Sequence, residues 1–136
     1  MNVIRSADSR RTETPNAIMT TLASPSQGQA ANAVWRVEMR PGSAGPVHGI
    51  DAEQVWTVLD GGASVQLGAE AAALSPGDTI VMPAGIARRI TADPQAGLVA
   101  IVAAPASMRA YALEGTPAGP HPAVSDSAKL VPAWVA

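Results

Sequence analysis

The sequence predicts an all-β domain, a sandwich or barrel built from short strands. Gly and Pro number 12 each among 136 residues, an excess that is typical of a chain with many tight turns. Short stretches rich in Val, Ile and Thr lie between the turns, and none has the period of an amphipathic helix. Because 47% of the residues are hydrophobic, a chain of this length can fill one core.

The expected strands follow one another at short, regular intervals. They are residues 3–4, 17–22, 33–39, 55–59, 63–67, 69–74, 79–82, 87–91 and 98–103. In the 33–39 stretch, apolar Trp35, Val37 and Met39 alternate with charged residues, which indicates a strand with one buried face. The sequence Asp-Gly-Gly at residues 60–62 predicts a hairpin turn between two of these strands.

The composition divides the chain into three parts. These are an N-terminal arm with short strands (1–31), a barrel (32–113) and a C-terminal tail that packs on the barrel (114–136). The tail ends in an apolar segment, residues 130–135, which needs cover from water. No motif surrounds Tyr111 or Trp134, and we expect both to be packing residues.

Composition also excludes several classes of function. A net charge of −2 without a clustered basic face argues against nucleic-acid binding. Cysteine is absent, which excludes disulfides, thiolate metal sites and cysteine nucleophiles. The N-terminus lacks the apolar region of a secretory signal, and the longest apolar stretch, 96–106, is too short to span a membrane. We therefore expect a cytoplasmic protein with neither nucleic-acid nor membrane partners.

Two runs of residues carry Gly and Pro at distinctive intervals. The first contains Gly42, His48, Ile50, Gln54 and Gly61, and the second contains Gly77, Pro83, Gly85, Arg88 and Ala92. Their spacing resembles the two motifs of the cupin family, over about residues 32–104. The chain is similar to small single-domain bacterial cupins, and the resemblance implies a single jelly-roll β-sandwich barrel.

The metal-binding positions of these motifs are degenerate. In the family, two histidines and a glutamate of the first motif and a histidine of the second hold a divalent metal. His48 matches one of these positions, but Ile50, Gln54 and Arg88 occupy the others. Neither isoleucine nor a guanidinium can ligate a metal. His48 and Gln54 alone fall short of three protein ligands, and His121 would help only if the tail entered the barrel, so we expect no cofactor.

The same substitutions favour a pocket that binds a small molecule without a metal. The family register points Arg88 into the barrel, where a charge is costly to bury unless an anion or water meets it. We therefore expect Arg88 to hold a carboxylate or enolate oxygen and His48 to act as general acid or base. The candidate substrate-binding residues are Gln54, Trp56, Ile50 and Arg36. The alternatives are a bracing ion pair between Arg88 and Glu38 or Glu53, and a His48 without any role.

Three functions follow from this interpretation. The first is an isomerase, cyclase or dehydratase that acts by proton transfer on a small anionic or polyketide-like molecule in bacterial secondary metabolism. The second is a non-catalytic ligand-binding or sensory cupin, and the third is a metal-dependent cupin such as a dioxygenase, which the ligand count disfavours. We also expect a homodimer, because the arm is long enough to reach a neighbour and exchanged N-terminal strands are common in similar cupins.

Overall fold

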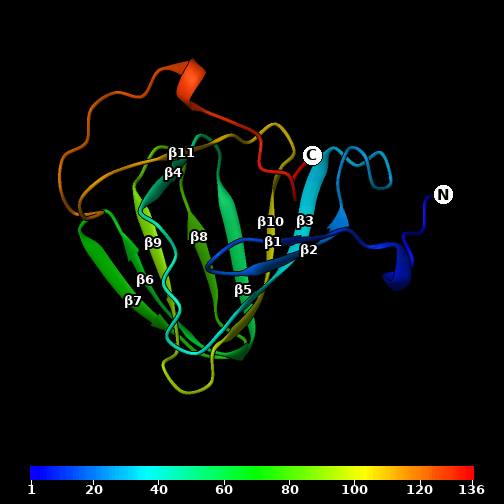
Figure 1. The fold of residues 1–136 in the computed structure, drawn as a ribbon, viewed down its shortest axis with the longest axis horizontal. Helices are drawn as coiled ribbons and strands as arrows, with labels where there is room; N and C mark the ends of the chain where they lie inside the picture. Colours follow the sequence, from blue (N-terminus) through cyan, green and yellow to red (C-terminus); the bar gives the residue numbers. More distant parts are fainter.

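The computed structural model describes residues 1–136 as two antiparallel sheets that face each other and close into a barrel (Figure 1). The six-stranded sheet has the order β1-β2-β3-β10-β5-β8. Its strands are β1 (Arg11–Glu13), β2 (Ile18–Ala23), β3 (Asn32–Met39), β10 (Leu98–Pro105), β5 (Gln54–Gly61) and β8 (Thr79–Met82). The predicted all-β class is confirmed.

The five-stranded sheet has the order β11-β4-β9-β6-β7. Its strands are β11 (Ala110–Ala112), β4 (His48–Ile50), β9 (Arg88–Ala92), β6 (Ala63–Leu67) and β7 (Glu70–Leu74). Helical structure is limited to two short 3-10 turns, η1 (Ser6–Asp8) and η2 (Asp126–Ala128). No helix in the structure has the length and hydrophobicity needed to cross a membrane.

Alternation along the strands separates the core from the surface. On β3, Trp35, Val37 and Met39 are buried, whereas Arg36 and Glu38 form an ion pair at 3.5 Å on the outer face. The inward residues of both sheets combine into one cluster of 19 buried hydrophobic side chains. Because the chain has no Phe, Val, Ala and Met make up most of this cluster, together with Trp35 and Trp56.

Most expected strands form within one or two residues of their predicted limits, with instructive exceptions. Residues 3–4 form no strand, and Val3 is exposed. Strands β1, β4 and β11 were not expected, because three residues are too few to show an alternating pattern.

The hairpin predicted at residues 60–62 is wrong. Strand β5 pairs with β10 and β8, whereas β6 pairs with β7 and β9 in the other sheet. The chain therefore passes between sheets at this turn, where the N–H of Gly62 donates to the Gly97 carbonyl and its own carbonyl accepts from the Asp93 N–H, each at 2.9 Å. A glycine-rich turn predicts a change of direction but does not determine which strand becomes the partner.

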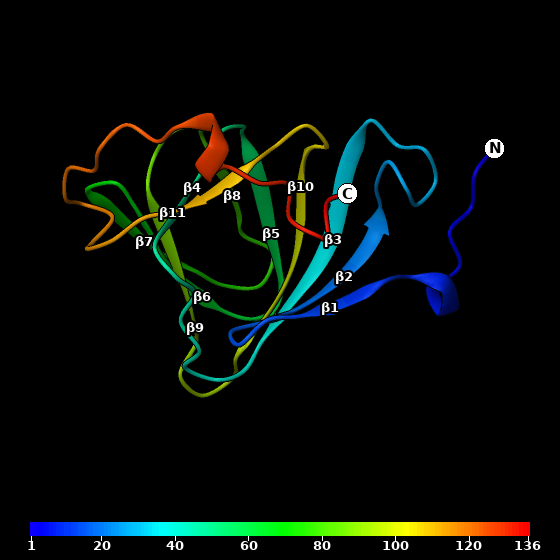
Figure 2. The same cartoon turned by 45° about the horizontal axis from the view of Figure 1, so that its top comes forward.

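Both ends of the chain return to the barrel. The β1–β2 hairpin extends the larger sheet beyond β3, and the tail crosses the end of the barrel that is uppermost in Figures 1 and 2. Leu130 and Ala110 exchange two backbone hydrogen bonds of 2.8 and 3.0 Å. The Thr21 hydroxyl donates to the Trp134 carbonyl at 2.8 Å, and Val135 is fully buried. Residues 130–135 thus cover one end of the barrel.

The corner between the sheets can be tested at Gly97. Gly97→Ala is expected to lower the free energy of unfolding by roughly 3 kcal/mol, because left-handed backbone and a steric clash both oppose a side chain there. Gly97 has a φ of +71°, and an added Cβ would lie 2.6 Å from the Met39 carbonyl oxygen. Chemical denaturation measures the loss.

Gly85 provides the matched control for this substitution. Its φ of +77° is similar, but an added Cβ would meet nothing within 4 Å. Gly85→Ala is therefore expected to cost only about 1 kcal/mol, the price of the left-handed backbone alone. Equal losses in the two variants would contradict the role of the Gly97 corner.

Candidate functional site

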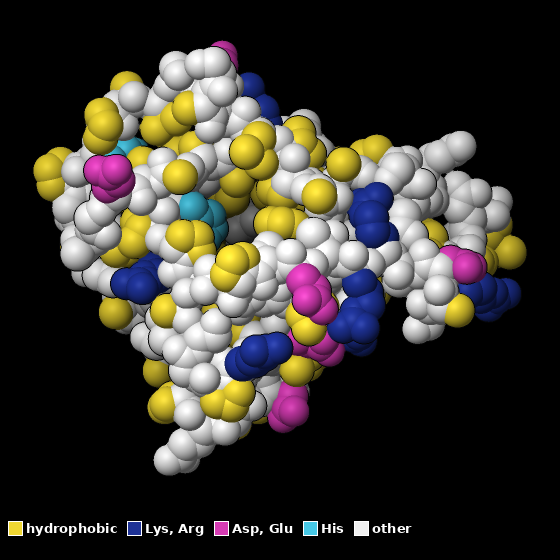
Figure 3. All heavy atoms as spheres, viewed as in Figure 1, with side chains coloured by type: hydrophobic (Ala, Val, Ile, Leu, Met, Phe, Trp, Pro, Cys, Tyr) yellow, Lys and Arg dark blue, Asp and Glu magenta, His cyan; other side chains and the backbone are white.

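A cavity of about 530 Å³ opens at the end of the barrel that the tail crosses. Figure 3 shows it as a hollow bordered by hydrophobic side chains and a histidine. Its walls come from both sheets, from the β1–β2 turn and from the tail, and 16 of its 24 lining residues are hydrophobic. None is Asp, Glu, Lys or Arg. The volume is typical of a small-molecule site, and the lining is almost free of charge.

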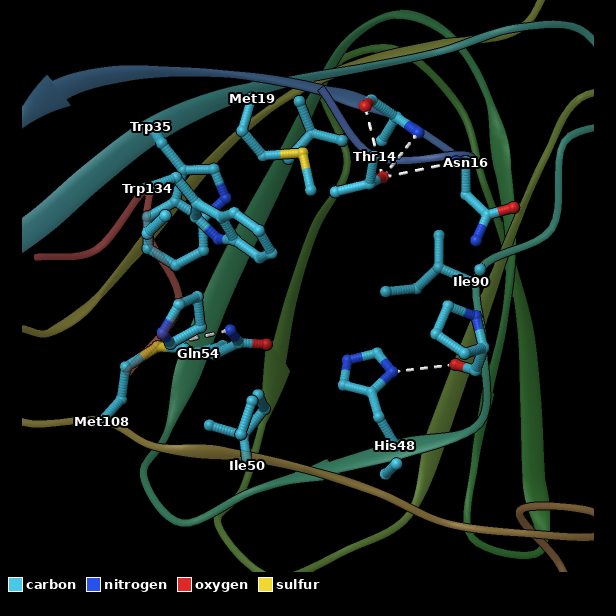
Figure 4. Close-up of a pocket in the computed structure, with 18 of the residues that line it drawn as sticks. Thr14, Asn16, Met19, Trp35, His48, Ile50, Gln54, Ile90, Met108 and Trp134 are labelled. Carbon is cyan, nitrogen blue, oxygen red and sulfur yellow. Dashed lines mark hydrogen bonds between the residues drawn. The ribbon is translucent and has the colours of Figure 1, made fainter. Parts of the chain in front are cut away.

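His48, on β4, is the only titratable imidazole or carboxylate group at this cavity (Figure 4). Its Nδ1 lies 2.8 Å from the Pro46 carbonyl oxygen. Because a carbonyl can only accept, we assign the proton to Nδ1, which leaves the Nε2 lone pair on the cavity side. Burial, together with the positive charge of Arg88, lowers the pKa of His48 against the opposing effect of the Pro46 hydrogen bond. The imidazole is therefore neutral near pH 7 and can accept a proton.

Arg88 is the cross-strand neighbour of His48 and is completely buried. Its guanidinium donates to the Pro83 carbonyl at 2.8 Å, to the Ile86 carbonyl at 3.0 and 3.2 Å, and to Gln54 Oε1 at 3.5 Å. Burial lowers the pKa of Arg88 to about 10, so the side chain is still cationic at neutral pH.

This arrangement differs from both expectations for Arg88. The side chain points inward but does not line the cavity, and it makes no ion pair with Glu38 or Glu53. Glu38 pairs with Arg36 instead. Backbone carbonyls of the 83–86 turn satisfy the guanidinium, so Arg88 braces the barrel without a carboxylate.

Gln54 links this brace to the cavity wall. Its side chain is 3% exposed, and Oε1 accepts from Arg88 and from Trp56 Nε1, the latter at 3.4 Å. Its Nε2 lies 3.6 Å from Met108 Sδ. Gln54, Trp56 and Ile50 all line the cavity. The structure does not place Arg36 there, because strand alternation turns that side chain to the outer face of β3.

Much of the lining lies outside the sequence motifs. The additional polar and large side chains are Thr14, Asn16, Met19, Trp35, Met39, Met108, Tyr111 and Trp134. Trp35 shares the inward face of β3 with Met39, so the alternation of β3 in the sequence could have identified Trp35 as a residue of the cavity wall. Tyr111 and Trp134, expected to be packing residues, also reach the cavity, and Tyr111 packs over Gly49, which leaves room for the ring.

Comparison with known proteins identifies the family. Residues 35–103 match the family Cupin domain. The chain belongs to the cupin family. No curated protein matches it.

Several solved structures share this cupin fold. The polyketide cyclase RemF from Streptomyces resistomycificus is 21% identical with a TM-score of 0.69, over 87% of this chain and 90% of that one. A cupin 2 domain-containing protein from Halorhodospira halophila is 23% identical with a TM-score of 0.63, over 69% and 68%. An oxalate decarboxylase from Bacillus subtilis is 15% identical with a TM-score of 0.65, over 73% of this chain and only 28% of that one. At these identities the likeness is one of fold.

The metal site of the cupin family does not fit the residues of this chain. No three His, Cys, Asp or Glu side chains lie close enough together to hold an ion. At the motif positions, Ile50 and Arg88 cannot ligate and the Gln54 amide is engaged by its neighbours, so His48 is left alone. His121 lies exposed in the tail and does not line the cavity. A resident cation would also lie near the buried guanidinium, which would repel it.

The bracing role of Arg88 leads to a prediction. Arg88→Met is expected to lower the free energy of unfolding by roughly 2 kcal/mol, because the partly buried Pro83 and Ile86 carbonyls and the buried Gln54 oxygen lose their donor. Affinity for a cavity ligand should change little, because the guanidinium does not line the cavity. Thermal and chemical denaturation measure the first effect, and equilibrium dialysis of a bound probe measures the second.

Arg89→Met is the matched control for this variant. Arg89 is exposed on the same strand and makes one hydrogen bond, to the Gly45 carbonyl at 3.1 Å. Its replacement is expected to change stability by less than about 0.5 kcal/mol. An Arg88→Met protein of unchanged stability that no longer binds ligand would show instead that the guanidinium acts on the ligand.

Proposed function

We propose that this cupin is a metal-independent enzyme that moves a proton on an uncharged, polyketide-like small molecule, as an isomerase, cyclase or dehydratase does. The observation that carries the proposal is the free Nε2 of a neutral His48 at an uncharged cavity. A base that is neutral at the working pH is ready to accept a proton without first losing one.

His48 has the surroundings required for abstraction of a proton from carbon next to a carbonyl group. Nε2 would take the proton while the C–H electron pair moves into the carbonyl to form an enolate. The Pro46 carbonyl, which accepts from Nδ1–H, would stabilise the imidazolium that forms. Return of the proton to another carbon gives isomerisation. Attack of the enolate carbon on a second carbonyl, with the His48 proton passing to the new alkoxide, gives cyclisation.

The cavity lining supports an uncharged substrate in place of the anionic one expected from the sequence. A carboxylate would be removed from water without a cationic side chain among the lining residues, since Arg88 does not face the cavity. The similarity to the polyketide cyclase RemF, which extends over 90% of that protein, is in keeping with cyclisation among the proton-transfer reactions.

Proton abstraction can be measured without the natural substrate. The probe is 2-acetonaphthone, an uncharged two-ring ketone whose methyl protons are acidic through the adjacent carbonyl. In D2O the protein is expected to accelerate exchange of these protons for deuterium, followed by NMR, and His48→Gln should reduce the acceleration by at least about a hundredfold. The rate should stay high down to a pH below the ordinary histidine pKa, because the pKa of His48 is lowered.

Two controls accompany the exchange measurement. Chelator treatment should leave the rate unchanged, and the purified protein should contain less than about half an equivalent of transition metal, because His48 alone offers too few ligands. Exchange that depends on a stoichiometric metal would refute the metal-independent mechanism. Probe binding without any His48-dependent exchange would favour a non-catalytic binding or sensory cupin.

We also propose a homodimer, in which the outer face of β5 and β8 is the interface. The arm strands pair within their own chain, β1 with β2 and β2 with β3, while Leu59 and Val81 on the outer face are 52% and 53% exposed. Burial of such apolar side chains favours association.

Light scattering at micromolar concentration should give twice the chain mass, and Val81→Glu should reduce the measured mass to that of one chain. Val131→Glu, at an exposed tail position, is the control. A monomeric wild-type protein would contradict the proposal.

A further inference from the structure

The indole N–H of Trp35 lines the cavity without a hydrogen-bond partner in the protein. Trp35 is only 2% exposed, so the cavity is the place from which a partner can reach it. The neighbouring indole shows the contrast, because Trp56 Nε1 donates to Gln54 Oε1 at 3.4 Å. The Trp35 N–H is not among the fully enclosed side-chain atoms that lack a partner, so it is accessible from the cavity. An acceptor atom on a bound ligand can therefore replace water at this donor.

Asn16, which is partly buried, carries a second polar group without a partner in the protein, at the opposite wall. It lies in the turn between β1 and β2, and Figure 4 shows its side chain extending toward the His48 side of the cavity. Its main chain is fixed, because its N–H donates to Thr14 Oγ1 at 3.3 Å and its carbonyl accepts from Ser43 Oγ at 3.0 Å. The carboxamide itself makes no hydrogen bond within the protein, whereas the Gln54 oxygen accepts from Arg88 and Trp56 and its nitrogen lies against Met108 Sδ.

The chemistry of these groups limits what they can bind. An indole N–H only donates, so its partner must be an acceptor such as a carbonyl or ether oxygen. The carboxamide has a donor nitrogen, and Figure 4 shows it on the same side of the cavity as His48, the base that would generate negative charge on a carbonyl oxygen. Neither group is charged, and no charged side chain lines the cavity to compensate an anion.

We propose that Trp35 Nε1 and the Asn16 carboxamide bind two oxygen atoms at opposite ends of an uncharged fused-ring substrate. This proposal rests on the proton-transfer function above and assigns the substrate's orientation in the same site. Asn16 holds the carbonyl oxygen next to the carbon that His48 deprotonates, and Trp35 holds the distal oxygen. Asn16 lies outside the matched cupin residues 35–103, and Trp35 is the first of them, so neither belongs to the metal-site positions.

Four probes separate the two contacts. They are 6-methoxy-2-acetonaphthone, with an oxygen at each end; 2-acetonaphthone, with the ketone alone; 2-ethylnaphthalene, without oxygen; and 2-naphthoate, an anion of similar size. Equilibrium dialysis gives their affinities for the full chain. The wild-type protein is expected to bind the methoxy ketone most tightly and the naphthoate most weakly.

Two variants assign each oxygen to its donor. Trp35→Phe keeps an aromatic ring but removes the N–H, and it should reduce the affinity ratio of the methoxy ketone to the plain ketone by roughly three- to tenfold. Asn16→Ala should reduce the ratio of the plain ketone to the hydrocarbon by a similar factor. Each variant should leave the other ratio unchanged.

Several results would overturn the proposal. These are no binding of any neutral probe to the wild-type protein, tighter binding of 2-naphthoate than of 2-acetonaphthone, or ratios that the variants do not change. The wild-type comparison decides the charge preference even if Trp35→Phe does not fold.

Deuterium exchange keeps this proposal separate from the proposed function. His48-dependent exchange with unchanged affinity ratios would overturn the two-oxygen orientation and leave proton transfer intact. The expected ratios without exchange would support the orientation and refute the catalytic role.

Discussion

The guanidinium of Arg88 meets the backbone of the 83–86 turn and the Gln54 amide inside the barrel, and the rest of the site depends on this contact. Its partners are neutral oxygen atoms, so its hydrogen bonds are satisfied while its charge is not balanced by a nearby carboxylate. Such a charge repels any other cation in the barrel. It opposes protonation of its cross-strand neighbour His48, and it would equally oppose a divalent metal.

The loss of the metal ligands and the protonation state of the remaining histidine are therefore linked. A metal-binding cupin needs an anionic ligand to balance its cation, and this chain has neutral Gln54 in that place. With the positive charge moved to Arg88 and kept behind Gln54, the cavity surface is left uncharged. His48 then faces an apolar space as a neutral imidazole, and in the proposed reaction hydrogen-bond donors would take over the role of a metal in stabilising a developing oxyanion.

The sequence predicts the features that are encoded locally. Alternation on β3 and the Gly and Pro turns are enough for an all-β fold, and the register of the cupin motifs predicts the inward side of the strands, where His48 and Gln54 line the cavity. The partner of Arg88 could not be predicted, because every residue has a backbone carbonyl and a sequence pattern does not mark the ones that approach. Similarly, the turn at residues 60–62 indicates a reversal, but only pairing across the barrel determines that β6 joins the other sheet.

The cavity wall is also formed by residues that are distant in the sequence, and a sequence pattern cannot predict that they come together. Asn16 and Trp134 lie far apart in the sequence, and both reach the cavity because the β1–β2 hairpin and the tail are held on either side of it. The barrel strands position His48 and Gln54 through cross-strand pairing, with Arg88 and Met82 respectively. A turn and a tail segment carry fewer such constraints. In the proposed function, proton transfer therefore depends on the barrel, whereas the fit of a particular ligand depends largely on the segments that close over it.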